Sequence, residues 1–219
     1  MSHHARPTVI LPALDDATRH LVLVAAAISG GSEADSRSAL AAAHAAAVPG
    51  LWVEEVVLQS YLFAGFPRAL NAMREWRRIS GQRAPADDPR SALDQAPTWA
   101  ADGEATCAVV YGDFYRRLRH NIAELHPALD AWMIVDGYGK VLSRDGLDLA
   151  RRELCVVAAC AVQGQDRQLH SHLHGAVNAG VAPDVVAQVL EVLEQVLPAD
   201  AAQRYRLLWR RVRQGFDAA

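Results

Sequence analysis

The sequence predicts an all-α protein made of two repeated antiparallel helical units, and three observations lead to this prediction. Alanine and leucine are abundant and 51% of the residues are hydrophobic, whereas the apolar–polar alternation of half-buried strands is scarce. Long apolar segments are separated by short stretches rich in Gly, Pro and Asp. One helical pattern also occurs twice, at residues 18–62 and again at 151–193.

Four helices are expected in the first third of the chain. The segment "DDATRHLVLVAAAIS" begins with acidic residues, which favour a helix N-terminus, and ends before two glycines. Ser36 is the expected cap of "RSALAAAHAAAV", which stops at a Pro-Gly pair. "VEEVVLQSYLFAG" is the third helix, and Pro67 opens the fourth, "RALNAMREWRRI".

The middle of the chain reads as a linker followed by bridging helices. Residues 80–97 hold three prolines and several charges, as is typical of a linker. The segments 103–125 and 127–139 follow and are both helix-like. Gly137 and Gly139 are expected to interrupt the second of them.

The last third repeats the helical pattern of the first. Asp148 is the expected cap of "LARRELCVVAACAV", and Asp166 of the histidine-containing helix that ends near Gly180. Two more helices, 183–197 and 200–216, complete the chain. The expected organisation is therefore an N-terminal repeat at 1–80, a linker with bridging helices at 81–145 and a C-terminal repeat at 146–219.

The two copies align if the first has a loop about three residues longer. This register pairs Arg19 with Arg152, His20 with Glu153, Ala42 with His172, His44 with His174 and Gly50 with Gly180. The copies then share an architecture but not a Glu-and-His pair. We therefore expect a degenerate site in the first copy.

Composition excludes several classes of function. The chain carries 22 basic and 25 acidic residues, whereas a nucleic-acid-binding protein usually has a clear basic excess. No apolar run is long enough to span a bilayer, and the N-terminus lacks a signal-peptide segment. We therefore expect a soluble cytoplasmic protein, no nucleic-acid or membrane partner, and a packing role for the basic and aromatic C-terminal helix. The three cysteines, an odd number, are expected to be small buried hydrophobes.

Histidines occupy positions 170, 172 and 174. On a strand all three would share a face and resemble a metal site, but the flanking cap and glycine favour a helix. On a helix His170 and His174 share one face, and His172 lies about 200° away. His170 and His174, with His44 from the other repeat, could bind a metal, or they could be exposed histidines with no ligand. His172 is expected to face a neighbouring helix.

The segment "GKVLSRDGLDLARRELCVVAACAVQGQDRQLHSHLHGAVNAGVAPDVVAQVL" resembles the carboxymuconolactone decarboxylase domain, a family that also includes alkylhydroperoxidase D. "VVLQSYLFAGFPRALNA" in the first copy is similar to the third and fourth helices of that family. The resemblance covers about 18–75 and 140–195. It implies a homo-oligomer, for which a trimer of two-repeat chains is the expected form because family members often form three-fold rings.

The resemblance places Glu153 and His172 on the glutamate and histidine positions of alkylhydroperoxidase D. Gln165 and Gln168 stand where that enzyme has its two redox cysteines. A peroxidase of that type needs one thiolate to attack the peroxide and a second thiol to resolve the product. Dithiol peroxidase activity is therefore not expected.

The decarboxylase branch of the family also lacks the dithiol, and it uses no cofactor. By resemblance, His172 supplies a proton and Glu153 orients it during decarboxylation or enol protonation of a small carboxylated or lactone substrate. The candidates for binding a substrate carboxylate are Arg144, Arg151 or Arg152, because a guanidinium can bind a carboxylate through two hydrogen bonds. Tyr138 and Gln168 are candidate polar residues of the pocket wall. A non-catalytic binding or assembly protein on the same scaffold, with Glu153 and His172 as a buried structural pair, remains an alternative, as does a metal-using variant.

Overall fold

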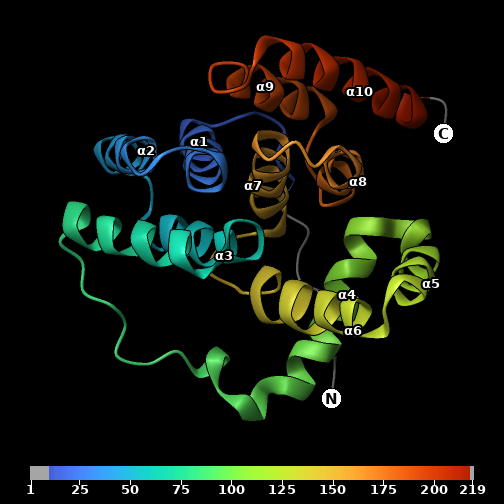
Figure 1. Cartoon of the computed structure of the whole chain (residues 1–219), viewed down its shortest axis with the longest axis horizontal. Helices are drawn as coiled ribbons and strands as arrows, with labels where there is room; N and C mark the ends of the chain where they lie inside the picture. The colour runs from blue at the N-terminus through green and yellow to red at the C-terminus, as the bar shows by residue number, and fades with distance from the viewer. Residues whose placement is uncertain (1–9, 218–219) are drawn as a thin grey trace.

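The computed structural model describes residues 10–217, which fold almost entirely into helices (Figure 1). The α-helices are α1 (Asp16–Gly30), α2 (Glu33–Ala45), α3 (Gly50–Ser80), α4 (Ala96–Tyr111), α5 (Tyr115–Leu125), α6 (Pro127–Trp132), α7 (Leu149–Val162), α8 (Asp166–Asn178), α9 (Pro183–Leu193) and α10 (Ala199–Asp217). Three 3₁₀ turns, η1 (Pro89–Ser91), η2 (Leu93–Gln95) and η3 (Gly112–Phe114), and a π-helix, η4 (Met133–Leu142), complete them. The predicted all-α fold is confirmed. Among the described residues no helix is both long and apolar enough to cross a membrane.

Helix α3 is a hairpin of two helices rather than one rod. Gly65 has φ 78° and ψ 166°, a conformation that glycine adopts readily and other residues do not, and Pro67 follows it. The two halves run back along each other, because Glu54 in the first half accepts two hydrogen bonds, of 2.6 and 2.8 Å, from Arg77 in the second. The expectation that Pro67 opens a fourth helix is therefore confirmed.

The two repeats match in register along their whole length. Helices α1 and α7 begin at residues 16 and 149, α2 and α8 at 33 and 166, and α3 and α9 at 50 and 183, a difference of 133 each time. By the same difference α10 corresponds to the second half of α3, and the equivalent residues Trp76 and Trp209 are both buried. The two-repeat prediction is thus confirmed.

The prediction of a longer loop in the first copy is wrong, because the helices of both copies start at equivalent positions. Ser32, not Ser36, caps α2 through a reciprocal pair of hydrogen bonds with Asp35, so α2 begins earlier than the sequence pattern indicated. As a result, His172 corresponds to Ala39 rather than Ala42. The corrected register also pairs His174 with Ala41, Gly175 with Ala42 and Gly50 with Pro183.

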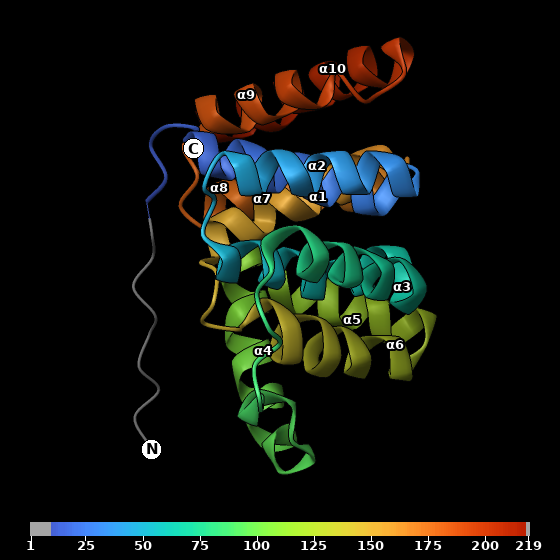
Figure 2. The ribbon, with the colours of Figure 1, turned by 90° about the vertical axis from the view of Figure 1, so that its left-hand side faces the viewer.

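The repeats pack around their equivalent first helices. Helix α1 contacts α7, and the cross-contacts are reciprocal, because α1 touches α9 while α7 touches α3. Figure 2 shows the result as layers, with the α9–α10 pair on one side, α1, α2, α7 and α8 in the middle, and α3 together with the bridging helices α4, α5 and α6 on the other side. This arrangement is a pseudo-two-fold pairing of the repeats within one chain.

The Ala/Val-rich helices are covered within the chain. In α7 every residue from Arg152 to Ala161 is buried, and in α1 most residues from Leu21 to Ser29 are. Helices α1 and α7 contact each other, so each repeat covers much of the apolar surface of the other.

The bridging segment packs as a unit against the C-terminal repeat. Helices α4 and η4 cross so closely that a Cβ on Gly139 would lie 1.8 Å from the Trp99 carbonyl oxygen, and one on Gly103 would lie 2.1 Å from that of Ile134. Gly137 and Gly139 do not interrupt the helix as expected, since it continues as a π-helix.

Two helix ends in this half also test the sequence prediction. The expected single helix over 103–125 is broken at Gly112, which has φ 51° and ψ −132°. Asp148 caps α7 as expected, by accepting from the Arg151 amide at 2.9 Å. Asp166 is the first residue of α8, and the cap position itself falls on Gln165.

Candidate active site

Helices α7 and α8 lie side by side and bring Glu153 and His172 together (Figure 1). The Nδ1 atom of His172 lies 2.8 Å from Oε2 of Glu153. Glu153 is fully buried, and His172 is only 7% exposed. With the carboxylate ionised, Nδ1 carries a hydrogen and donates a hydrogen bond to Glu153, which fixes the orientation of the ring.

Gly175 makes room for this pair. A Cβ at this position would lie 2.6 Å from Oε2 of Glu153 and 2.6 Å from Cγ1 of Val110. The carboxylate therefore occupies space that any other residue at 175 would fill with its own side chain. A glycine in the interior of a helix costs stability relative to alanine, which is the signal in the sequence that could have marked this position.

Two polar atoms of the pair have no partner within the part of the chain that the structure describes. Oε1 of Glu153 is buried and accepts no hydrogen bond. Nε2 of His172 has no hydrogen bond to any residue in the range 10–217, and it is not among the buried unpartnered atoms. The fold therefore holds the pair at Nδ1, and Nε2 of His172 is the polar atom of the pair that keeps some exposure and has no partner among residues 10–217.

The bridging segment supplies the surroundings of the pair. The Tyr111 ring, at the end of α4, lies edge-on to His172 with 6.3 Å between ring centroids. Tyr138 of η4 packs against Tyr111 at 6.2 Å and thus lies behind it. The expected wall residue Tyr138 therefore reaches the pair through Tyr111, which the sequence analysis missed because no motif or spacing marks it.

Burial keeps the hydroxyl and thiol groups around Glu153 in their neutral forms. It raises the pKa of Tyr111 to about 12, against a smaller opposing effect of a hydrogen bond with Tyr138. Burial also raises the pKa of Cys107 and Cys160 to about 12, and the negative charge of Glu153 adds to this effect. Neither thiol is a nucleophile near neutral pH.

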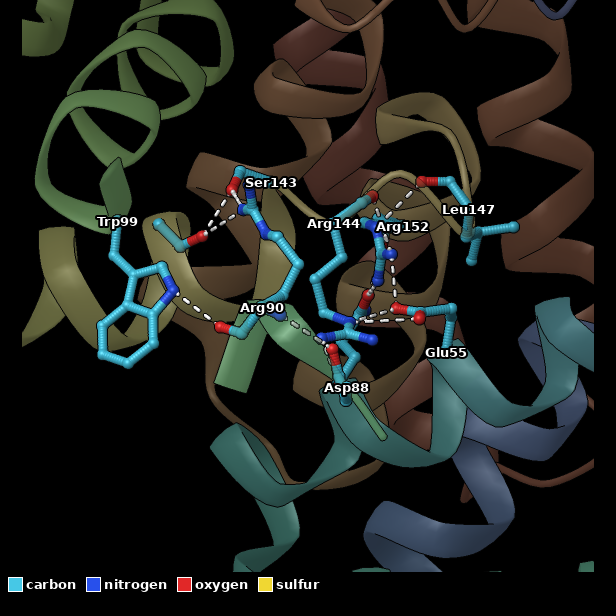
Figure 3. A network of polar contacts seen from close by, with 10 residues as sticks. Glu55, Asp88, Arg90, Trp99, Ser143, Arg144, Leu147 and Arg152 are labelled. Atoms are coloured by element: carbon cyan, nitrogen blue, oxygen red, sulfur yellow. Dashed lines mark hydrogen bonds and ion pairs between the residues drawn. The ribbon is translucent and has the colours of Figure 1, made fainter. Parts of the chain in front are cut away.

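The arginines predicted to hold a substrate carboxylate belong to a different cluster (Figure 3). Arg152 is fully buried and donates to Glu55 at 2.7 Å. Arg144 donates to both oxygens of Glu55, at 3.0 and 2.9 Å, and to Asp88 at 2.9 Å. Successive side chains on a helix diverge by about 100°, so Arg152 faces α3 while the adjacent Glu153 faces α8. The structure does not bring Arg144 or Arg152 to the His172 site.

The remaining two candidates also lie outside the pair. Arg151 binds Asp148 at 2.7 Å and Asp15 at 2.6 Å. Gln168 is exposed on α8, in the turn before His172. Arg151 lies on α7 and Gln168 on α8, as predicted, but neither contacts the pair. Of the predicted residues on these two helices, only Glu153 and His172 bind each other.

The other histidines do not form a metal centre in the described part of the chain. His170 and His174 share a helix face, with 5.0 Å between their ring centroids, and Phe216 packs on His174. His44 instead packs edge-on against Trp76 in the first repeat. Over residues 10–217 no three His, Cys, Asp or Glu side chains are grouped as metal ligands would be.

The fold and the pair define an α-helical protein with a buried carboxylate–imidazole site, and comparison with known proteins identifies its family. The model of the carboxymuconolactone decarboxylase family matches residues 3–78 and 127–210, which correspond to the two repeats. The chain belongs to this family. The matched regions leave out most of the bridging segment, including Tyr111.

One curated relative is "Peroxisomal protein 2" of the yeast Schizosaccharomyces pombe. It is 26% identical over 145 residues, which cover 66% of this chain and 68% of the relative.

Proposed function

We propose that this protein catalyses cofactor-independent acid–base chemistry on a small carbonyl or lactone substrate, with His172 as the proton-transferring group and Glu153 as its orienting partner. The observation that carries the proposal is the 2.8 Å contact at Nδ1 combined with an Nε2 that has no partner among the described residues. A carboxylate that orients an imidazole and stabilises its positive charge leaves the opposite nitrogen for the substrate.

Decarboxylation or enol protonation is the reaction class that we propose. In the first case the bond to the departing carboxylate breaks, CO2 leaves, and the electron pair enters the conjugated carbonyl system as an enolate. The Nε2–H of the His172 imidazolium then protonates carbon, and the ring becomes neutral while Nδ1 keeps its hydrogen bond to Glu153. Solvent restores the proton, and no redox partner is needed.

Tyr111 supports this reaction as a neutral hydrogen-bond donor. Its raised pKa, about 12, keeps the phenol protonated over the working pH range. Its ring is partly exposed beside the nearly buried His172. An enolate oxygen placed beside His172 would therefore meet a donor that does not ionise.

Recognition of a substrate carboxylate is not part of this proposal. Arg144, Arg151 and Arg152 are all engaged by acidic residues of the fold. The proposed substrate class is therefore defined by the reacting carbonyl group.

Ultraviolet-monitored turnover of 4-carboxymuconolactone and a panel of β-keto and lactone acids tests the proposal. We expect turnover of at least one compound, lost in His172→Ala and retained in the matched control His20→Ala, because His20 occupies the position of Glu153 in the first repeat. Turnover that survives in His172→Ala would contradict the assignment. No turnover across the panel would reject the proposed substrate class.

A second candidate function is a binding or assembly role in which the pair is structural. The 7% exposure of His172 favours it. In that case His172→Ala would lower the free energy of unfolding without changing any turnover, and hydrogen–deuterium exchange at α8 would rise.

A further inference from the structure

The outer face of the α3 hairpin is apolar and uncovered. Four of its side chains are strongly exposed: Leu51 at 57%, Leu58 at 38%, Phe66 at 65% and Leu70 at 53%. Two partly buried neighbours extend it, since Tyr61 stacks on Phe66 and Met73 lies one turn beyond Leu70. We call these six residues the α3 face.

The same face of the second repeat is charged and polar. The register of 133 residues gives the counterparts of the α3 face as Asp184, Glu191, Glu194, Ala199, Gln203 and Arg206. Glu194 and Arg206 form an ion pair at 2.8 Å, and Asp184 pairs with Arg213 at 2.7 Å. A scaffold that is stable with a charged face in one copy does not require an apolar face in the other.

The size of the α3 face fits the core of a dimer interface. With about 150–250 Å² for a large apolar side chain, its four most exposed residues leave on the order of 400 Å² open. A standard interface buries about 800 Å² per partner, of which somewhat more than half is apolar. The α3 face alone therefore supplies most of the apolar area that such an interface needs.

The charge on the α3 face also suits a copy of itself. The charged residues in and around the face carry both signs: Glu54 and Arg77 pair through two hydrogen bonds, exposed Arg74 lies one turn from Leu70, and Asp136 lies near Tyr61. A face with one sign of charge repels its own copy, whereas this face does not. We propose that the α3 face docks on the α3 face of a second copy of this chain about a two-fold axis, in place of the trimer that the family resemblance implies, while the charged face of α9 and α10 stays in solvent.

Sedimentation equilibrium of the full chain tests this interface. We expect a dimer for the unaltered protein and, for Leu70→Glu, a dissociation constant raised at least about tenfold, since the added charge would be buried at the contact. The matched control is Gln203→Glu, the same change at the equivalent position of the second repeat, and it should leave the dimer intact. A monomer at every concentration would overturn the proposal, as would a trimer or equal dissociation by both variants.

Cysteine cross-linking provides a second test that does not depend on introducing a charge. The three native cysteines are buried, so a single exposed thiol can be introduced cleanly. A flexible bis-maleimide linker should join two copies of Leu58→Cys into a covalent dimer, because the linker does not require the two thiols to lie on the two-fold axis as a disulfide would. It should not join two copies of the counterpart variant, Glu191→Cys. Failure of Leu58→Cys to cross-link, or efficient cross-linking by Glu191→Cys, would place the contact elsewhere. Neither experiment depends on the proposed enzymatic function.

Discussion

The two repeats fold alike and differ where chemistry is placed. In the second repeat Glu153 and His172 meet beneath the end of α4, and Val110 of α4 packs against Gly175. In the first repeat the corresponding positions hold His20, Ala39 and Ala42, and Ala42 is exposed. The helix pair is thus common to both copies, whereas the buried site exists only where the bridging segment covers it.

A second pair of equivalent positions shows the same effect. Arg152 of α7 is fully buried and bound to Glu55 of α3. Its counterpart Arg19 is exposed, and together with Gln188, the counterpart of Glu55, it lines a shallow depression that is open to solvent. The bridging segment contributes Arg144 and Asp88 to the first cluster and nothing to the second. The bridging segment therefore buries the Arg152 position of the second repeat, whereas the equivalent Arg19 position of the first repeat stays exposed.

The largest predicted effect is on catalysis at the second repeat. Glu153→Gln keeps the shape of the side chain but removes the charge that stabilises the imidazolium, so we expect turnover to fall by about 10²–10⁴-fold. Steady-state kinetics would show the loss in kcat. His20→Gln, the same test in the first repeat, should leave kcat unchanged, and a comparable loss there would mean that the repeats are not functionally distinct.

The next effect is on stability at the Arg152 cluster. Glu55→Gln leaves two arginines without their shared carboxylate, one of them fully buried, and should lower the free energy of unfolding by about 3–5 kcal/mol. Gln188→Ala at the equivalent position should change it by less than about 0.5 kcal/mol, because the site is exposed. Urea denaturation followed by circular dichroism measures both. Equal losses would show that burial by the bridging segment is not what separates the two sites.

A smaller effect on turnover and stability is expected from replacing Gly175, the glycine of α8 that packs against Glu153. Gly175→Ala introduces a methyl group 2.6 Å from Oε2 of Glu153. We expect at least a tenfold loss of turnover and about 1–3 kcal/mol of destabilisation from overpacking, despite the better helix propensity of alanine. Ala42→Gly in the first repeat should cost only about 1 kcal/mol, through propensity alone. A stabilised Gly175→Ala protein with full activity would contradict the close approach seen at this position.

The fold could be predicted from the sequence because the patterns that indicate helices and their ends are local. Helical periodicity, the cap at Asp148 and the break at Pro67 each depend on a few neighbouring residues, and the repeat made the pairing of α7 with α8 visible. The prediction of the α2 cap was wrong because two suitable residues, Ser32 and Ser36, lie close together in the sequence. Only the hydrogen bond from the Asp35 amide to Ser32 distinguishes them, and it is seen only in the structure.

The site was only partly predictable. Glu153 and His172 followed from resemblance to a family, but the direction of each arginine depends on which helix packs beside it. Arg152 is one residue from Glu153 and faces α3 instead. Tyr111 comes from a segment that is 61 positions before His172 and outside the family match, so neither local pattern nor resemblance indicates its place.

The smallest effect concerns the buried thiols. Cys155 and Cys160 correspond to Val22 and Ala27 in the first repeat, so Cys155→Val and Cys160→Ala restore residues that the scaffold already accepts. We expect each to change the free energy of unfolding by less than about 1 kcal/mol.

The same thiols should also be unreactive in the native protein. Burial raises their pKa from 9.0 to about 12, so the thiolate is on the order of one part in ten thousand at pH 8. Because the folded protein holds these protons more tightly than the unfolded chain, their contribution to stability is complete below pH 9 and is lost as the pH rises toward 12. Alkylation with iodoacetamide followed by mass spectrometry should therefore label neither residue at pH 8 unless the protein is unfolded. Rapid labelling of native Cys160 would instead indicate a thiol open to solvent beside Glu153 and would restore thiol chemistry as a possible role of the second repeat.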